Sequence, residues 1–145
     1  MRIVCPKFKH NEMIPSKYTC DSEDINPSLE IEDIPKNAKS VALIMDDPDA
    51  PRGTWVHWVV WNIPIHTKNI EEGIEPEGTQ GTTDFGRKGY GGPCPPSGTH
   101  RYFFKVYALD KELELKEGST KMDLERSMKA HIIEKAELIG LYKRL

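Results

Sequence analysis

Three apolar segments of strand length stand out in the hydrophobic pattern of the chain. Residues 40–46 (SVALIMD) are almost continuously apolar and precede the turn-rich residues 47–51, so they predict a buried central strand. Residues 55–63 (WVHWVVWNI) are rich in aromatic and β-branched side chains and stop before Pro64, which predicts a second strand buried on both faces. Residues 101–109 (RYFFKVYAL) predict a third strand. This pattern is that of a mainly β protein.

Less regular segments separate these strands. Residues 29–34 alternate apolar and acidic side chains, which predicts a half-exposed strand near the edge of a sheet. Residues 66–99 contain eight glycines and four prolines, too many for a regular element, while Phe85 and Tyr90 indicate that this loop is ordered. Loops of this length are uncommon in compact domains unless they have a function. We therefore expect an ordered loop with a functional role.

A helical period begins at Thr120, where apolar residues start to recur every four positions and predict an amphipathic helix. The positions of this apolar stripe are Leu124, Met128, Ile132 and Ala136. Thr120, with Asp123 three residues later, resembles the capping box at the start of a helix. Gly140 interrupts the later part of the pattern. We expect the helix to end near Ala136 and residues 137–143 to form a last strand; a helix that continues to Leu145 is the alternative.

The length and composition of the chain are those of one ordinary domain, residues 1–145. Leu, Ile, Val and Phe together make up 32 of the 145 residues, just above the level of about 20% that a modest core requires. The net charge of −3, without a cluster of Lys and Arg, gives no electrostatic footprint for nucleic acid or an anionic membrane surface, and we expect neither nucleic acid as a main partner nor integral membrane contact. The longest apolar run is residues 41–45, and no signal segment is visible, so we expect a soluble protein in the cytoplasm.

Charged residues and cysteines give two further expectations. Lys and Glu each occur 14 times and Gln once, a bias typical of proteins from very hot habitats. The three cysteines, Cys5, Cys20 and Cys94, lack the spacing of a zinc finger, so we expect neither a disulfide framework nor a zinc site, and at least one free thiol. Intracellular disulfides do occur in organisms from hot habitats, which leaves a bridge between Cys5 and Cys20 open. We interpret Cys94 as a structural bystander.

His57 is the first candidate for chemistry, because it is a polar residue within an apolar strand. On a regular strand it shares a face with Trp55, Val59 and Trp61, and an imidazole held there needs a hydrogen-bond partner. A histidine that is satisfied in the core is the ordinary interpretation. Three polar clusters elsewhere in the chain favour a site instead.

Each of the three clusters could contribute to a binding site. Residues 46–49 (DDPD) place three carboxylates directly after the predicted central strand, where proline restricts the backbone, although such aspartates also cap turns. His100 and Tyr102 fall on one face at the start of the third strand. Residues 91–98 (GGPCPPSG) combine glycines, which let backbone N–H groups approach a ligand, with prolines that stiffen the loop. Alone, this loop could be only a rigid connector; together, the clusters favour a preorganised anion site.

Two of these patterns are characteristic of a known family. DPDAP at residues 47–51 is followed by WVHW at residues 55–58, and GYGGPCPPSGTHRY occupies residues 89–102. The similarity extends over nearly the whole chain, from Phe8 to Tyr142. The chain resembles the phosphatidylethanolamine-binding protein family, in particular its bacterial and archaeal branch, the Raf kinase inhibitor-like proteins.

The resemblance implies both a fold and a ligand pocket. The fold would be an antiparallel β-sandwich, with a large central sheet against a smaller sheet and one helix near the C-terminus. The pocket, which takes phosphate, acetate or a phospholipid head group in the family, would be formed by Asp47, Asp49, His57, Gly92, Pro93, Pro95, His100 and Tyr102. We further expect Asp47 to lie beside His57 and to orient its ring. Animal members add a C-terminal helix at the pocket, which we do not expect here because the chain ends at Leu145.

Three classes of function are compatible with these residues. The favoured one is a binding module for a small anion, such as phosphate, sulfate or a phosphorylated head group, because two imidazoles, a phenol and loop N–H groups supply donors. The second is inhibition of a serine protease or modulation of a kinase through an exposed surface, as described for relatives. The third and weakest is a metal-assisted hydrolase with ligands from Asp47, Asp49, His57 and His100. We expect no enzymatic activity and no cofactor or metal, and we leave a homodimer open.

Overall fold

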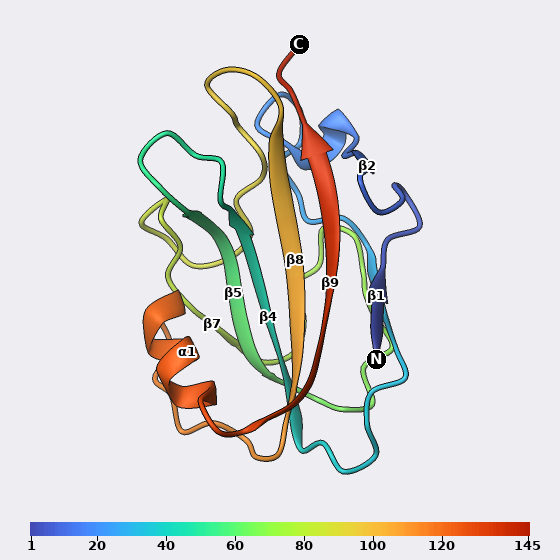
Figure 1. Ribbon diagram of the computed structural model, residues 1–145, viewed down its shortest axis with the longest axis vertical. Coiled ribbons are helices and arrows are strands. Elements are labelled where there is room, and N and C mark those ends of the chain that lie inside the picture. Colours follow the sequence, from blue (N-terminus) through green and yellow to red (C-terminus); the bar gives the residue numbers. More distant parts are fainter.

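Two β-sheets face each other across an apolar core, and one helix lies on the far side of the larger sheet (Figure 1). The computed structural model describes residues 1–145. The large sheet has the strand order β2-β9-β8-β4-β5-β7, and only its β2–β9 pair is parallel. Its strands are β2 (Glu12–Met13), β4 (Ser40–Asp47), β5 (Trp55–Ile63), β7 (Thr79–Gln80), β8 (His100–Leu109) and β9 (Ile132–Tyr142).

The small sheet has three antiparallel strands in the order β1-β3-β6. They are β1 (Arg2–Val4), β3 (Leu29–Glu32) and β6 (Asn69–Ile70). The remaining regular elements are a short 3-10 helix, η1 (Ser16–Tyr18), and the helix α1 (Lys121–Met128). The expected β-sandwich of a large and a small sheet, with one helix late in the chain, is confirmed.

The continuous apolar run of β4 follows from its position between two cores. Alternate residues of a strand point to opposite faces of the sheet. Leu43 and Met45 face the core between the sheets, whereas Ala42 and Ile44 face a smaller core beneath α1. All four side chains are fully buried. A strand that is covered on both faces needs apolar residues at successive positions, which is the observed pattern.

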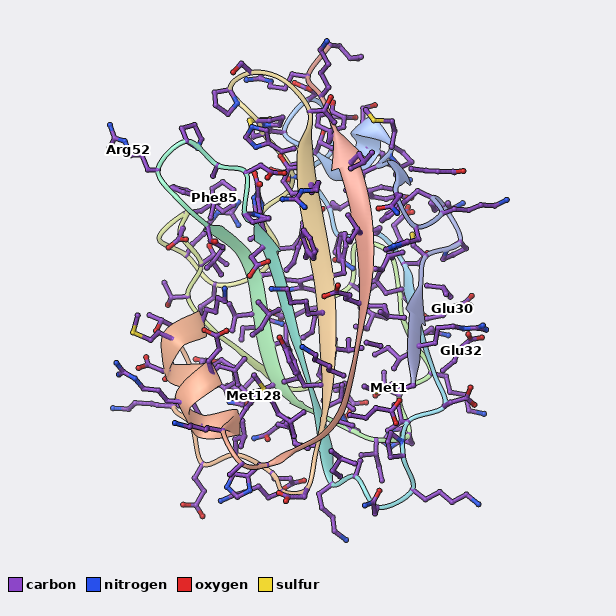
Figure 2. The ribbon with its side chains drawn as sticks, in the orientation of Figure 1. Met1, Glu30, Glu32, Arg52, Phe85 and Met128 are labelled. Atoms are coloured by element: carbon purple, nitrogen blue, oxygen red, sulfur yellow. A yellow bond between two sulfur atoms is a disulfide. The ribbon has the colours of Figure 1, made fainter.

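The three strands predicted from apolar runs are confirmed as β4, β5 and β8. The predicted half-exposed strand is β3, in which Leu29 and Ile31 are buried while Glu30 and Glu32 point away from the molecule (Figure 2). Its expected place near an edge is wrong, because β3 is the middle strand of the small sheet. Its exposure arises instead because nothing covers the outer face of that sheet. Within residues 66–99, the only regular elements are β6 and β7, with two residues each.

The helix begins where predicted but ends eight residues earlier. Thr120 caps its N-terminus through a reciprocal capping box with Asp123. The helix ends at Met128, and Ala130 adopts a left-handed conformation with φ 68°. Residues 132–142 then form β9, which pairs with β8 at ten positions, so long-range pairing prevails over the helical period. No helix of the structure is long and apolar enough to span a membrane.

One disulfide bond is present, contrary to expectation. It joins Cys20 to Cys94, whose Cα atoms lie 5.4 Å apart, and leaves Cys5 as a buried thiol. The alternative bridge from Cys5 to Cys20 and the bystander role of Cys94 are therefore wrong, whereas the expected free thiol is confirmed at Cys5. The bonded cysteines are separated by 74 residues, and only the fold brings them together. Burial raises the pKa of the Cys5 thiol, which is typical of an inert structural cysteine.

A buried carboxylate links the helix to the large sheet. Asp46 is 2% exposed and lies on the side of β4 that faces α1. The Nζ atoms of Lys105 in β8 and Lys121 in α1 lie 3.2 Å and 2.7 Å from its Oδ2 atom. A buried charge without partners would be strongly destabilising. The two ammonium groups therefore allow an aspartate at this position and attach the start of α1 to the sheet.

We expect Asp46→Asn to lower the free energy of unfolding by about 2–4 kcal/mol, because it leaves the two lysines facing each other without their counter-ion. The matched control is Asp110→Asn, which breaks the exposed ion pair of Asp110 with His131 and should change the free energy of unfolding by less than about 0.5 kcal/mol. Urea unfolding followed by tryptophan fluorescence measures both variants. Equal losses would contradict the structural role of the buried carboxylate.

Candidate ligand-binding site

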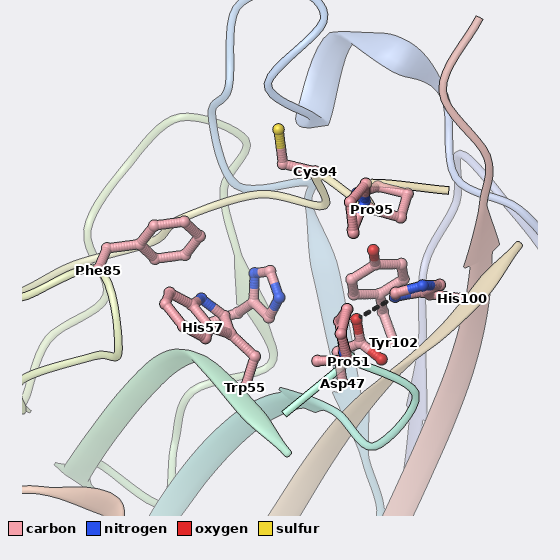
Figure 3. A pocket seen from close by; sticks show the side chains of 11 residues that line it. Asp47, Pro51, Trp55, His57, Phe85, Cys94, Pro95, His100 and Tyr102 are labelled. Carbon is pink, nitrogen blue, oxygen red and sulfur yellow. Dashed lines mark hydrogen bonds and ion pairs between the residues drawn. The ribbon is translucent and has the colours of Figure 1, made fainter. Parts of the chain in front are cut away.

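A cavity of about 360 Å³ opens at one end of the large sheet, where β4 ends and β5 and β8 begin (Figure 3). The residues that line it are Asp47, Ala50, Pro51, Trp55, His57, Phe85, Cys94, Pro95, Pro96, His100 and Tyr102. The lining thus includes five residues of the predicted site, namely Asp47, His57, Pro95, His100 and Tyr102. The predicted residues that do not line the cavity are Asp49, Gly92 and Pro93.

A β-bulge at the start of β5 carries His57 into the cavity. On the neighbouring strand β4, Met45 pairs with Trp58, and Asp46 pairs with Val56. His57 is therefore an extra residue without a partner, which is the definition of a bulge. Bulges commonly redirect a side chain beside a functional site.

The bulge decides which face of the sheet His57 occupies. A regular period of two predicts that His57 lies with Val59 and Trp61, and this is wrong. Those two side chains pack in the core beneath α1. His57 lies on the opposite face, with its ring centroid 5.2 Å from that of Tyr102. The extra residue therefore moves the imidazole from the core beneath α1 to the cavity.

The backbone holds the His57 ring in one orientation. Its Nδ1 atom lies 2.7 Å from the carbonyl oxygen of Gly91, which can only accept, so Nδ1 carries the hydrogen and donates it. Burial lowers the pKa of His57, and the hydrogen bond to Gly91 and the nearby Asp47 carboxylate oppose this effect only in part. At neutral pH the ring is therefore uncharged, and its Nε2 atom carries a lone pair.

His100, the first residue of β8, is oriented by a carboxylate. Its Nδ1 atom donates to Oδ2 of Asp47 over 2.7 Å, and both residues are buried (Figure 3). The other carboxylate oxygen, Oδ1, accepts from the backbone N–H of Asp49 at 2.7 Å. Because both oxygens are engaged, Asp47 positions His100.

The expected partnership of Asp47 with His57 is therefore wrong. The Asp47 carboxylate is close enough to favour a charge on His57, but its hydrogen bond goes to His100. Strand order explains why either pairing is conceivable, since β4 lies between β5 and β8. Both histidines are fixed through Nδ1, one by a carbonyl and the other by a carboxylate. The Nε2 atom of each ring is left for a ligand.

Tyr102 adds a phenol to the same cavity. It follows His100 by two positions on β8, and the two rings stack with their centroids 6.5 Å apart, so their predicted common strand face is confirmed. Burial, together with the Asp47 carboxylate, raises the pKa of Tyr102 far above its ordinary value, although a hydrogen bond from the Cys94 backbone opposes the rise. The phenol stays protonated and can donate a hydrogen bond.

Asp49 supports the cavity from outside. Its carboxylate accepts hydrogen bonds from the backbone N–H and the guanidinium of Arg101, each over 2.9 Å. The Arg101 guanidinium holds the pKa of the Asp49 carboxyl below its usual range. The pair ties the turn after β4 to the start of β8. No group of three or more His, Cys, Asp and Glu side chains in the structure is arranged to hold a metal ion.

Two glycines of the loop before β8 allow close packing. A Cβ atom on Gly92 would lie 2.3 Å from the carbonyl oxygen of Tyr18 and 2.4 Å from Oδ1 of Asp24. A Cβ atom on Gly91 would lie 2.3 Å from the ring of Phe85. The N–H of Gly92 donates to Asp24 at 2.8 Å. This N–H is therefore used within the protein, and the role of Gly92 is to let the loop approach its neighbours.

The prolines of this loop have separate roles. The carbonyl of Pro93 accepts from the backbone N–H of Cys20 at 3.1 Å, so Pro93 belongs to the contact with the segment after η1. Pro95 and Pro96 line the cavity. Cys94 lies between these two contacts.

Two aromatic residues complete the cavity and were not predicted as site residues. Trp55 and Phe85 pack edge to face with ring centroids 5.5 Å apart, and Phe85 also packs on the His57 ring at 5.3 Å. Trp55 and Phe85 are 39% and 37% exposed. In the sequence, Phe85 indicated only that the loop is ordered. Its position as an aromatic residue within a glycine-rich loop is the signal that could have identified it as a site residue.

The sequence matches a family model along almost its whole length. The model describes the phosphatidylethanolamine-binding protein family and covers residues 5–143. The chain belongs to this family.

Similar proteins come from archaea and bacteria. A UPF0098 protein of Pyrococcus horikoshii is 53% identical over 97% of this chain and 76% of its own, and one of Aquifex aeolicus is 51% identical over 99% and 89%. The phosphatidylethanolamine-binding protein homologue CT736 of Chlamydia trachomatis is 41% identical in sequence. Its crystal structure matches this structure with a TM-score of 0.97 over 99% of this chain and 97% of the CT736 chain. Escherichia coli YbcL, described as a member of the mammalian family, is 30% identical, with a TM-score of 0.91 over 99% and 98%. An origin in a hot habitat stays a prediction, although thermophilic archaea have relatives of this protein.

We expect Asp47→Ala to lower the free energy of unfolding by about 1–3 kcal/mol, because the buried His100 ring and the N–H of Asp49 lose their acceptor. Asp49→Ala removes a more exposed pair with Arg101 and should lower the free energy of unfolding by less than about 1 kcal/mol. Urea unfolding compares the two variants. The anchoring role of Asp47 would be refuted by losses of the same size.

Proposed function

We propose that the cavity binds a small anion, such as phosphate, sulfate or the phosphorylated head group of a larger molecule. The arrangement of His57 and His100 carries this proposal. Each ring donates its Nδ1 hydrogen to a fixed acceptor, the Gly91 carbonyl or the Asp47 carboxylate, so a protonated ring offers Nε2–H as a donor to a ligand. Two such donors, together with the phenol of Tyr102, can surround one oxyanion.

The charges around the cavity suit an anion when both histidines are protonated. Protonated His100 and Asp47 form an ion pair whose charges cancel, so a protonated His57 leaves a net positive charge. Burial opposes protonation of His57, and a bound anion favours it. Anion binding is therefore coupled to proton uptake at His57.

The other walls suit the organic part of a ligand. A cavity of about 360 Å³ has the size of known small-molecule sites and is larger than one oxyanion needs. Trp55 and Phe85 add apolar surface at its rim. The family is named for phosphatidylethanolamine, whose head group joins a phosphate to a short organic chain. These features support a phosphorylated head group as the class of ligand.

We propose binding rather than catalysis because the cavity offers no free nucleophile beside its histidines. The sulfur of Cys94 is bonded to Cys20, the raised pKa of Tyr102 keeps its phenol protonated, and no serine or threonine lines the cavity. Inhibition of a protease and modulation of a kinase stay predictions from the resemblance.

Phosphate should raise the melting temperature of the protein, because a ligand that binds only the native state stabilises it in proportion to ln(1 + [L]/Kd). At about one hundred times Kd, the shift should be about 5–10 °C for a chain of this length. His57→Ala and His100→Ala each remove a donor and should abolish the shift. His131→Ala changes an exposed histidine beyond the other end of β8 and should preserve it. Differential scanning fluorimetry of the wild type and the three variants measures the shift in melting temperature. Equal shifts in all four proteins would exclude the cavity as the phosphate site.

Sulfate affinity should rise as the pH falls from about 7.5 to 5.5, a range in which sulfate keeps its charge while histidines titrate. Burial lowers the pKa of His57 in the free protein, and bound sulfate raises it again, so binding takes up a proton at pH values between the two. Within that interval the affinity increases by up to about tenfold per pH unit. Isothermal titration calorimetry in buffers of different ionisation enthalpy measures both affinity and proton uptake. A flat profile would mean that neutral donors hold the anion.

A further inference from the structure

Residues 94–99 form one wall of the cavity, which is called the wall below. The disulfide between Cys20 and Cys94 joins this wall to the segment after η1. Cys94 lines the cavity next to Pro95 and is exposed to solvent (Figure 3). Cys20 is half-buried. The bond is therefore accessible to reagents from outside, in contrast to the buried thiol of Cys5.

The wall has few attachments besides this bond. Residues 94–99 form no backbone–backbone hydrogen bond, and five of these six residues are exposed. The exception is Pro95, which is buried against the cavity. The wall is therefore restrained by the packing of Pro95 and by the covalent bond, and the covalent bond is the restraint that a chemical reaction can remove.

The other end of the bond is held independently. Thr19, next to Cys20, is fully buried, and its hydroxyl donates to the carbonyl of Ser16 at 2.8 Å. The N–H of Cys20 donates to the carbonyl of Pro93 at 3.1 Å. These contacts do not involve sulfur and persist when the disulfide opens. Opening the bond therefore frees the wall beyond Pro93 and leaves its anchor in place.

We propose that the Cys20–Cys94 disulfide is a redox switch for the cavity, in which the oxidised protein holds the wall in place and binds the anion, and the reduced protein releases the wall and binds it more weakly. This inference rests on the anion-binding function proposed above. A site that must become ordered when its ligand arrives has a lower apparent affinity than a preorganised site. The oxidised form is therefore the binding form.

The switch opens by exchange with a dithiol, either a small molecule or a protein with two neighbouring thiols. A thiolate of the dithiol attacks Sγ of Cys94, the S–S bond breaks, and Cys20 leaves as a thiolate that takes up a proton. The second thiol then attacks the mixed disulfide, which releases Cys94 as a thiol and the reductant as a disulfide. Two electrons pass from the dithiol to the protein, and its two protons end on the two cysteines.

The test compares sulfate binding by the oxidised protein and by protein treated with dithiothreitol, using calorimetry at about pH 6, within the range over which sulfate affinity should rise. Titratable thiols in the denatured protein should increase from one to three per chain, because Cys5 is free and the bond supplies two more. Sulfate affinity should fall by roughly tenfold on reduction. Hydrogen exchange should accelerate at Gly91 and Gly92, whose amides donate to the His57 carbonyl and to Asp24 just before the wall, and should stay unchanged in β4.

Two variants separate the bond from other effects of the reductant. Cys94→Ser should bind sulfate as weakly as the reduced wild type, with or without dithiothreitol. Cys5→Ser removes the thiol outside the bond and should respond to dithiothreitol as the wild type does. Circular dichroism checks the fold before each titration. If Cys94→Ser does not fold, the comparison of oxidised with chemically reduced wild type tests the switch without it.

Failure of the redox switch can be distinguished from failure of the proposed anion-binding function. Unchanged sulfate affinity after reduction, a bond that resists dithiothreitol in the folded protein, or loss of the fold on reduction would each overturn the switch and leave anion binding by the oxidised protein intact. Absence of sulfate binding by the oxidised protein would overturn the proposed function. Hydrogen exchange then decides the switch alone, because unchanged exchange of Gly91 and Gly92 after reduction would show that the bond does not hold the wall.

Discussion

The antiparallel pairing of β4 with β8 determines where the cavity forms. The register is continuous along β4, and Asp46 near its end lies opposite Phe103 near the start of β8. Asp47 and His100 are 53 residues apart in the chain, and this register brings them within hydrogen-bond distance. A slip of one residue would turn either side chain to the opposite face. The apolar packing that fixes the register therefore also fixes the polar contact at its end.

Two neighbouring carboxylates of β4 are compensated in different ways on opposite faces. Asp46 faces α1 and meets the permanent charges of Lys105 and Lys121. Asp47 faces the cavity and meets the buried ring of His100, whose Nε2 atom is left for a ligand. The first arrangement joins two elements of the fold under all ordinary conditions. The second joins the end of the same strand to a ring that a ligand can contact.

Sequence reasoning succeeded where the information is local. The strands β4, β5 and β8 could be predicted because strands covered on both faces are largely apolar, and their ends carried the polar residues of the cavity. The failures concern contacts between distant residues. Nothing near Asp47 in the sequence shows that its partner is His100 and not His57, and nothing near Cys20 identifies Cys94. The helical period after β8 likewise gives no sign of the strand pairing that ends α1.

The bulge at His57 restricts where the chain can gain or lose residues. Deleting Val56 would remove the extra position, restore regular alternation and turn the imidazole toward the core beneath α1. Residues 49–51 of the neighbouring turn contact the site, whereas residues 52–54 at its tip are exposed, and Arg52 points into solvent (Figure 2). Insertions are tolerated in such exposed turns because they disturb no pairing. The tip of the turn can therefore change in length during evolution, while the three residues that follow Trp55 must keep their number.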